Sequence, residues 1–471
     1  MTRSDAIRTA LDWFDAGHFQ AELARRVARR TESQRGDAKE DLLAYLEGEI
    51  GPSVAALGCT WRLLDNPAGG TPFLFAERHE DAGVSTVLTY GHGDVVLGYG
   101  AQWRSGRSPW NVTVEGDRWY GRGTADNKGQ HSINLAALAR VLAARGKLGF
   151  NLKLLLEMGE EIGSPGLRAV CQRECGCLAA DVLIASDGPR LAATRPTLFL
   201  GSRGVFNFTL TVDLREGAHH SGNFGGLLAN PGTILANAIA SLVDGRGRIL
   251  VAGLRPPPIP DSVRRALAGI TPGDGDGPVI DRDWGEQELT PAERVFGWNA
   301  LEVLAFRTGN PDHPVNAIPP RAVAHLQVRF VAGCDFAQFL PALRAHLDAL
   351  GYANVRVAAS GDVPMRATRL DPEDPWVRRV AASIERTTGN TPAILPNIGG
   401  SLPNDCFAEV LGLPTVWIPH SYPGCSQHAP DEHLLASVAR EGLAIMTGIF
   451  FDVGDERAGE PRTVRATHQE R

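Results

Sequence analysis

Short apolar runs and helical periodicity alternate through the first part of the chain. Apolar runs bounded by turn residues, at 85–90, 150–156 and 181–185, predict three β-strands. Between the first two, apolar residues spaced along one helix face predict a helix over about 130–145. Strands that alternate with helices in this way are typical of βαβ units. We therefore expect an α/β fold, with an α/β/α domain built on a mixed, mostly parallel sheet.

The pattern changes near residue 203. Apolar and polar residues alternate strictly at 206–212 and 322–330, which predicts strands with one solvated face, as in antiparallel sheets. From about residue 375 the first pattern resumes. We therefore predict a discontinuous domain of residues 1–202 and 363–471, interrupted by an inserted α+β domain of residues 203–362 with an antiparallel sheet.

Composition narrows the class of protein. The chain has 471 residues, of which 43% are hydrophobic and 21% charged, and this is enough material for two globular domains. A formal net charge of -7 and the lack of a basic cluster argue against nucleic acid as a partner. No run approaches the ~20 apolar residues that cross a bilayer, and the start lacks the apolar core of a secretory signal. Seven cysteines, an odd number, suit a reducing compartment, so we expect a cytoplasmic protein without a membrane partner.

Polar motifs follow the three predicted strands directly. His92 and Asp94 come after the first strand, Glu160 and Glu161 after the second, and Asp187 after the third. Open α/β sheets bind ligands at the carboxyl ends of their strands, so we expect these side chains near one edge of the sheet. If the backbone at the two glutamates is extended, one side chain can bind metal while the other faces substrate.

Two more segments carry the same residue types. Asp126 lies in a glycine-rich loop just before the predicted helix, and Lys128 follows an asparagine, so the phosphate-binding P-loop pattern fails. His428 is followed by Asp431 and Glu432. Two histidines and several carboxylates form the ligand set of two divalent cations that share a carboxylate and activate water. We expect two zinc ions per chain, and cobalt or manganese would accept the same ligands.

Each segment alone has a simpler explanation. A His-x-Asp sequence at a turn arises often by chance, and adjacent glutamates are common in solvated turns. Their occurrence together favours the metal site. Serine-hydrolase chemistry is disfavoured because the chain has no Gly-x-Ser-x-Gly motif, and a His-Glu-x-x-His zinc helix is absent too.

The ordered segments resemble the M20 family of metallopeptidases and amidohydrolases. That family includes carnosinase-like dipeptidases, carboxypeptidase G-type enzymes, aminoacylases and acetylornithine or succinyl-diaminopimelate deacylases. The resemblance is carried by Gly121-Arg-Gly-Thr-Ala-Asp126-Asn-Lys-Gly and Gly159-Glu160-Glu161-Ile-Gly-Ser164, and it covers about Leu42 to Phe450. It implies a catalytic metal-binding domain, an inserted lid and dimerisation domain, and a homodimer formed through the inserted domain.

The resemblance also implies roles in the metal site. Five residues would be ligands: His92 and Asp187 of one cation, Glu161 and His428 of the other, and Asp126 of both. Asp94 would orient the first histidine. Glu160 would be the general base that accepts a proton from the metal-activated water and passes it to the leaving nitrogen. A cis peptide between Asp126 and Asn127 is expected, as in relatives.

In the inserted domain, the segment from Asp213 to Gly226 resembles the family's Asp-Leu-His-Ser-Gly-x-x-Gly-Gly sequence. By that match, His220 would stabilise the tetrahedral oxyanion, in many relatives from the neighbouring subunit. The segment is longer in this chain, so His219 is the alternative.

Three further residues would contact substrate. Arg329 matches the family arginine that binds a substrate carboxylate, and Gly400 and Ser401 match a substrate-contacting turn. The prediction is a dinuclear metal-dependent hydrolase of an amide bond in a small carboxylate-bearing molecule, either a dipeptide or an N-acyl amino acid. One alternative is the same metal site acting on a non-peptide amide, an N-carbamoyl group or an amino group, with the 253–291 insertion reshaping the pocket. A non-catalytic binding homologue is the other alternative.

Overall fold

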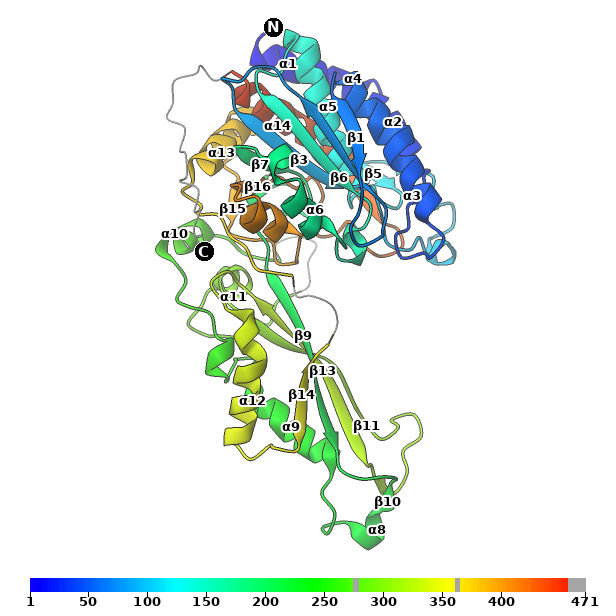
Figure 1. The fold of residues 1–471 in the computed structure, drawn as a ribbon, viewed down its shortest axis with the longest axis vertical. Coiled ribbons are helices and arrows are strands. Elements are labelled where there is room, and N and C mark those ends of the chain that lie inside the picture. The colour runs from blue at the N-terminus through cyan, green and yellow to red at the C-terminus, as the bar shows by residue number, and fades with distance from the viewer. Residues whose placement is uncertain (274–278, 361–364, 456–471) are drawn as a thin grey trace. The chain divides into compact units, whose positions relative to one another are not determined.

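The computed structural model describes residues 1–273, 279–360 and 365–455. The chain forms two compact units, each built from segments that are distant in the sequence (Figure 1). The first unit comprises Met1–Asp187, Val380–Thr391 and the chain from Cys425 onward. The second comprises Gly188–Arg379 and Pro392–Gly424. The predicted domain boundaries, at 202/203 and 362/363, stay a prediction.

Five strands lie side by side in the first unit, in the order β1-β2-β6-β3-β7. Strands β3, β6 and β7 are parallel, whereas β2 runs antiparallel to β1 and β6. The register aligns His92 at the end of β3 with Glu157 at the end of β6. The three predicted strands are confirmed as β3, β6 and β7. The strand bounds are β1 (Thr60–Leu64), β2 (Phe73–Arg78), β3 (Thr86–His92), β6 (Asn151–Glu157) and β7 (Val182–Ala185).

Two long helices, α5 (Lys128–Arg145) and α14 (Ala436–Val453), form the buried helical layer of the first unit. Most residues of both helices are buried, and α1 (Arg3–Asp15) packs against both. The predicted helix over 130–145 is confirmed as α5, whereas α14 was not predicted. The shorter helices are α2 (His18–Val27), α3 (Lys39–Tyr45), η1 (Leu46–Ile50), α4 (Gly51–Ala56), η2 (Gly100–Gln102), η3 (Glu160–Ile162), α6 (Leu167–Arg173) and α7 (Cys175–Leu178).

A small antiparallel sheet in the first unit joins two segments from opposite ends of the sequence. Its order is β17-β5-β4, with strands β4 (Thr113–Glu115), β5 (Arg118–Tyr120) and β17 (His433–Leu435). His433 pairs with Tyr120, so the chain before β17 lies next to the chain after β5. These are the segments that carry His428 and Asp126.

A four-stranded antiparallel sheet forms part of the second unit, in the order β11-β13-β9-β14. Alternate residues of β9 and β13, such as Phe208, Leu210 and Leu326, are buried with helices α9 and α12 in one core, which confirms the predicted alternation. Figure 1 shows both helices beside β9 and β14. The bounds are β9 (Gly204–Asp213), β11 (Ala300–Thr308), β13 (Arg321–Phe330), β14 (Val355–Ala359), α9 (Pro231–Leu242) and α12 (Phe339–Ala349).

Strand β11 is an edge of this sheet and was not predicted, because its sequence does not alternate between apolar and polar residues. Val303, Leu304 and Phe306 on it are 44%, 58% and 43% exposed. An edge strand offers unpaired backbone groups, and exposed apolar side chains beside them favour contact with another chain.

Three more strands of the second unit lie in the order β16-β8-β15, with β8 antiparallel to β16 and parallel to β15. The predicted α/β class, with a mixed sheet and a separate antiparallel sheet, is confirmed. No helix in the described part of the chain is long and apolar enough to cross a membrane. The remaining elements are β8 (Thr197–Phe199), β10 (His219–His220), β12 (Ala317–Ile318), β15 (Ala393–Leu395), β16 (Thr415–Trp417), α8 (Ser221–Phe224), η4 (Ala252–Leu254), α10 (Asp261–Leu267), α11 (Pro291–Phe296), η5 (Phe336–Gln338), α13 (Pro375–Thr388) and η6 (Cys406–Val410).

Candidate metal centre

Three strand ends bring histidine and carboxylate side chains together in the first unit. Strand β3 ends at His92, β6 ends at Glu157 and leads to Glu160, and β7 ends at Ala185 just before Asp187. Because β3 is parallel to β6 and β7, these ends point the same way. The structure thus brings together the side chains that follow the three predicted strands.

His92 is fully buried, and Asp94 sets the orientation of its ring. Nδ1 of His92 donates to the backbone carbonyl of Asp94 at 3.1 Å and lies 3.3 Å from Oδ1 of the same aspartate. Since Nδ1 carries the proton in this bond, Nε2 is left to face the centre. There it lies 3.1 Å from Oδ1 of Asp126 and 3.6 Å from Oδ2 of Asp187.

His428 meets the same shared aspartate from another segment. Its Nε2 lies 3.0 Å from Oδ2 of Asp126 and 3.0 Å from Oε2 of Glu161. The backbone of His428 has a φ of 60°, and Ser426 and Asp431 nearby have φ values of 55° and 61°. Residues other than glycine rarely adopt this left-handed conformation, and such strain clusters at functional sites.

Asp126 therefore belongs to two groups of potential metal ligands. In each group, the ligand atoms lie within 4.8 Å of one another: His92, Asp126 and Asp187 in one, and Asp126, Glu161 and His428 in the other. Imidazole nitrogens with carboxylate oxygens are the donors that zinc prefers, and manganese and cobalt accept them. The donor set fits two divalent cations that share one carboxylate.

The pKa values of these groups show how strongly the cluster favours positive charge. Burial would lower the pKa of His92, but hydrogen bonds to carboxylates, first Asp126 and then Asp187, raise it well above its usual value. Hydrogen bonds to Asp126 and Glu161 raise the pKa of His428 to about 11. Burial raises the pKa of Asp126, yet the two imidazoles outweigh burial and hold it below its usual range. Each imidazole must lose a proton in order to bind metal. A divalent cation would then replace the two protonated imidazoles as the positive charge that balances the carboxylates.

The two adjacent glutamates differ in what they reach. Their backbone forms the short helix η3, so the extended conformation considered from the sequence is wrong here. Consecutive residues of such a helix still point about 120° apart, and only Glu161 reaches His428. Burial raises the pKa of Glu161 to about 7, with Asp126 as the next cause. Burial also raises the pKa of Glu160, which belongs to neither group of potential ligands, well above its usual value.

Asp94 also holds the turn that carries both glutamates, a role that the sequence did not predict. Its Oδ1 accepts the N–H of Glu160, and its Oδ2 accepts the N–H of Glu161, each at 3.2 Å. One buried aspartate therefore positions His92 and both glutamates.

Two amide side chains beside the ligands were missed as well. Gln427 donates from Nε2 to Oδ2 of Asp126. Asn127 follows Asp126 through a cis peptide, as the family resemblance implied, and donates from Nδ2 to the carbonyl of Ser186 at 2.9 Å. The only signal in the sequence was that each amide is the neighbour of a predicted ligand.

Lys128 points into the protein rather than toward the metal ligands. Its Nζ donates to the carbonyls of Arg26, at 3.1 Å, and Arg29, at 2.7 Å. Arg26 lies in the last turn of helix α2 and Arg29 just after it, where carbonyl oxygens lack the partners that they have in a helix interior. Burial lowers the pKa of Lys128 to about 7. The lysine of this loop therefore has a structural function.

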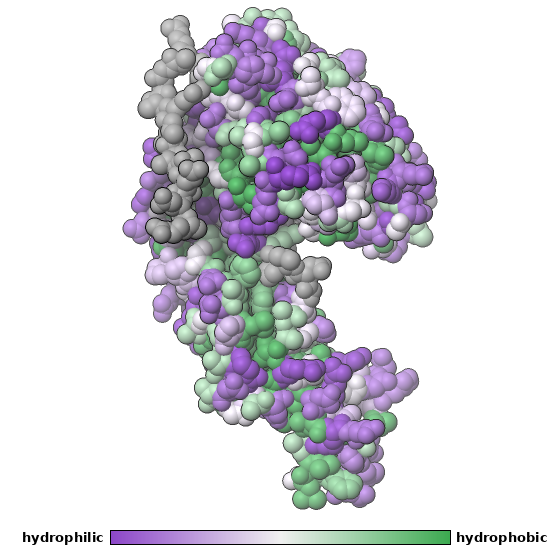
Figure 2. Space-filling view, viewed as in Figure 1, coloured by the Kyte–Doolittle hydropathy of each residue, from purple (hydrophilic) through white to green (hydrophobic). Residues whose placement is uncertain are grey.

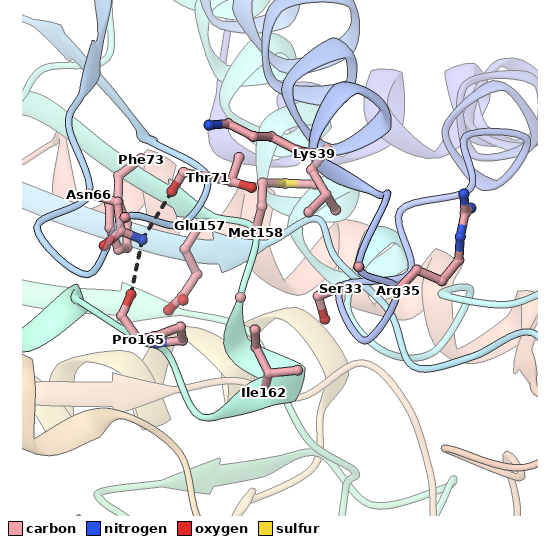
Figure 3. A pocket seen from close by; sticks show the side chains of 15 residues that line it. Ser33, Arg35, Lys39, Asn66, Thr71, Phe73, Glu157, Met158, Ile162 and Pro165 are labelled. Carbon is pink, nitrogen blue, oxygen red and sulfur yellow. Dashed lines mark hydrogen bonds between the residues drawn. The ribbon is translucent and has the colours of Figure 1, made fainter.

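A cavity of about 230 Å³ borders the turn that carries the glutamates (Figure 3). Its wall includes Glu157, Met158 and Ile162. The Glu157 carboxyl accepts hydrogen bonds from the hydroxyls of Tyr90, at 2.6 Å, and Ser164, at 3.0 Å. Burial raises the pKa of Glu157 to about 7, so this carboxyl holds a proton at mildly acidic pH.

In the second unit, the structure brings together the predicted substrate-contacting residues Arg329, Gly400 and Ser401. Nη1 of Arg329 donates to Oγ of Ser401 at 2.9 Å, and that hydroxyl donates to the carbonyl of Arg203 at 2.8 Å. The N–H of Arg203 donates to the carbonyl of Gly400. Burial, and then the charge of Arg329, lower the pKa of Arg203 to about 10. Two neighbouring guanidinium groups of this kind favour an anionic ligand. Arg203 was not predicted.

His219 and His220 also lie in the second unit, on β10. Nδ1 of His220 accepts the N–H of Gly222 at 3.1 Å, and the ring of His219 contacts the ring of Phe224 at 5.5 Å between centroids. The groups of potential metal ligands belong to the first unit. A catalytic function of either histidine stays a prediction.

Comparisons with known proteins agree with the ordered motifs. The family model described as peptidase family M20/M25/M40 matches residues 88–452. The chain is 28% identical over 326 residues to the cysteinylglycine-S-conjugate dipeptidase of Corynebacterium striatum, covering 68% of this chain and 70% of that protein. It is 37% identical over 187 residues to the Beta-Ala-His dipeptidase of Mus musculus, covering 39% of this chain and 37% of that protein.

A solved structure extends the likeness to nearly the whole chain. The crystal structure of the M20 family metallo-carboxypeptidase Sso-CP2 from Sulfolobus solfataricus has a TM-score of 0.77 and 26% identity, covering 93% of this chain and 99% of that one. Since the family model also spans most of the sequence, the chain belongs to the metallopeptidase family M20/M25/M40.

Proposed function

We propose that the protein is a dinuclear metal-dependent hydrolase that cleaves an amide bond in a small substrate with a free carboxylate, either a dipeptide or an N-acyl amino acid. The observation that carries the proposal is Asp126, whose two oxygens face different histidines and which belongs to both groups of potential ligands. A carboxylate shared in this way is what two divalent cations need in order to lie close together.

The same ligand groups define which residues would hold the cations. His92 and Asp187 would bind one cation, Glu161 and His428 would bind the other, and Asp126 would bind both. When bound, the cations would lower the pKa of water and polarise the substrate carbonyl.

Glu160 is the proposed general base. It lies next to a ligand in sequence, outside both ligand groups, and its N–H is held by Asp94. A carboxylate whose pKa is raised by burial can accept a proton from the attacking water and return it to the leaving nitrogen. A position beside the ligands, without metal binding of its own, suits this proton transfer.

Arg329 and Ser401 are the proposed contacts for the substrate carboxylate. They are already joined by a hydrogen bond, and Arg203 adds a second guanidinium beside them. A planar guanidinium binds a carboxylate through two parallel hydrogen bonds. Relatives of this chain that are named as dipeptidases act on substrates with such a carboxylate, which supports the same substrate class here.

A homodimer formed through the antiparallel sheet of the second unit is part of the proposal. Edge strand β11 exposes Val303, Leu304 and Phe306, and near β10 Phe224 and Leu227 are 40% and 78% exposed. Figure 2 shows hydrophobic residues gathered at the end of this unit that carries α8. Pairing of β11 of one subunit with β11 of the other across a twofold axis would cover the β11 side chains. In such a dimer, His220 would act from the neighbouring subunit.

The test combines metal counting with a substrate panel. Protein loaded with zinc should bind two equivalents by elemental analysis and hydrolyse dipeptides or N-acyl amino acids, and EDTA should stop the reaction. N-carbamoyl amino acids in the panel test the alternative chemistry. Hydrolysis that EDTA does not affect, or a protein that never binds more than one zinc ion, would refute the dinuclear mechanism.

A further inference from the structure

The carboxylate of Glu432 is among the most completely hydrogen-bonded groups in the first unit. It is 1% exposed. Its Oε1 accepts the N–H groups of Gly123, at 3.0 Å, Ala125, at 3.0 Å, and Asp126, at 3.1 Å. Its Oε2 accepts Nη1 of Arg122 at 2.6 Å and is also 3.1 Å from the Gly123 nitrogen. One side chain thus accepts three of the four backbone N–H groups of residues 123–126, the part of the loop that ends at the shared aspartate.

The small sheet explains how Glu432 reaches this loop. Strands β5 and β17 pair with His433 opposite Tyr120. The N–H of Gly121 donates to the carbonyl of Glu432 at 2.9 Å, which extends the ladder by one residue. Beyond that point the two segments of the chain separate, one toward Asp126 and the other toward His428. Glu432 lies where they separate.

The contacts of Asp126 divide into two sets. Its side-chain oxygens face the imidazoles of His92 and His428, whereas its N–H is held by Glu432. The position of the shared carboxylate therefore depends on the buried glutamate behind it. Burying a carboxylate is costly unless it is paired and hydrogen-bonded, and neighbouring backbone N–H groups form a concave site that binds such an anion.

We propose that Glu432 is a positioning residue of the metal centre, which sets zinc affinity by holding the loop before Asp126 against the segment that carries His428. It would bind no metal and touch no substrate. The inference rests on the proposed function, because it assumes that Asp126 and His428 are metal ligands.

The first unit contains a matched control for this interaction. Glu80 accepts the N–H groups of Leu148, at 2.6 Å, and Gly149, at 2.7 Å, together with Nε of Arg78 at 3.0 Å. These residues precede β6, at the end of the strand opposite Glu157. Glu80 therefore holds a loop by the same chemistry as Glu432 but away from the metal ligands.

The experiment compares Glu432→Gln with Glu80→Gln in the full chain. Zinc affinity is measured by competition with a fluorescent chelator, and the stability of the metal-free protein by thermal unfolding. Both variants should lose stability, but only Glu432→Gln should weaken zinc binding, by about 10- to 100-fold. Equal zinc affinity in Glu432→Gln, Glu80→Gln and the wild type would leave Glu432 with a merely structural function and overturn the inference.

A second pair of variants covers the case in which Glu432→Gln does not fold. Arg122→Lys keeps the positive charge but replaces two separate nitrogens, Nη1 that donates to Glu432 at 2.6 Å and Nη2 that donates to the carbonyl of Leu97 at 3.1 Å, with a single ammonium. It should lower zinc affinity, whereas Arg78→Lys should not. An unchanged affinity in Arg122→Lys would also overturn the inference. If the wild type itself binds no zinc, the proposed function fails first, and that result is distinct from equal affinities in wild type and variants.

Discussion

Substitution of the two adjacent glutamates by glutamine should separate a proton-transfer residue from a metal ligand. Both substitutions keep the side-chain shape and remove one charge. Asp94 holds the turn through the backbone N–H groups of Glu160 and Glu161, so neither substitution removes the hydrogen bonds that fix the turn. The two variants therefore differ only in what each side chain reaches.

Glu160→Gln should retain both zinc ions and lose turnover. Glu160 belongs to neither group of potential ligands, whereas its pKa is raised in the manner expected of a general base. Loss of a general base lowers kcat by about 10²- to 10⁴-fold, which corresponds to about 3 to 5 kcal/mol of transition-state stabilisation. Excess zinc should not restore activity.

Glu161→Gln should instead weaken zinc binding. Glu161 forms a group of three potential ligands with Asp126 and His428, and its Oε2 lies 3.0 Å from Nε2 of the histidine. A neutral amide is a poorer zinc ligand than a carboxylate, so part of the lost activity should return at high zinc concentration. The assays are zinc equivalents by elemental analysis and kcat across a zinc titration. If Glu160→Gln loses zinc while Glu161→Gln keeps it, the assignment of the two glutamates is reversed and the reasoning from η3 is refuted.

Metal removal, a buried carboxyl, the substrate carboxylate and the dimer each give a further test. EDTA should abolish hydrolysis and lower the free energy of unfolding by about 4 kcal/mol for each zinc site, relative to zinc at 1,000 times its dissociation constant. Unchanged melting would count against a site formed only in the folded chain. Glu157→Gln should stabilise the protein at pH 8 but not at pH 4. The pKa of the Glu157 carboxyl rises from 4.5 to about 7 on folding, so the folded protein loses stability as pH increases through that window, and glutamine removes this loss. Equal effects at both pH values in denaturant titrations would contradict this. Arg329→Lys should raise KM for a dipeptide about 10-fold or more and change KM for the dipeptide amide little, and equal effects on both substrates would exclude a carboxylate contact. Mixed dimers of His220→Ala and Glu160→Gln chains should recover about a quarter of wild-type activity if His220 acts from the neighbouring subunit, and no recovery would place it in its own chain.

Three of the five proposed ligands could be predicted because each of them lies at or just after the end of a strand whose apolar run is easy to recognise. Once β3, β6 and β7 were inferred to be parallel, His92, Glu161 and Asp187 had to lie at the same end of the strands. Asp126 and His428 required the order of motifs as well, since the strands next to them, β5 and β17, have only three residues each. Three residues carry no periodicity that predicts a strand.

Apart from the orientation of His92 by Asp94, the contacts that hold the proposed ligands could not be predicted, because they join side chains to backbone groups far away in the sequence. Gly123 and Glu432 are 309 positions apart, and the N–H of Glu160 is 66 positions from Asp94. Any buried carboxylate can accept a backbone N–H, so residue type alone does not reveal which carboxylate holds which N–H group. Edge strand β11 was missed for a different physical reason: its exposed apolar residues follow neither the two-residue nor the helical period that burial within one chain produces.

The loop Gly-Arg-Gly-Thr-Ala-Asp-Asn-Lys-Gly combines a potential metal ligand with the residues that hold it in place. Within this loop, Asp126 is the residue that belongs to the groups of potential metal ligands. Arg122 pairs with Glu432, and Lys128 bonds the carbonyls at the end of α2. A Cβ on Gly129 would lie 2.0 Å from the carbonyl oxygen of Thr124, so a larger residue there would displace the loop. The motif is specific because one residue supplies chemistry and its neighbours fix where that residue lies, and this is why a charged residue within it need not be catalytic.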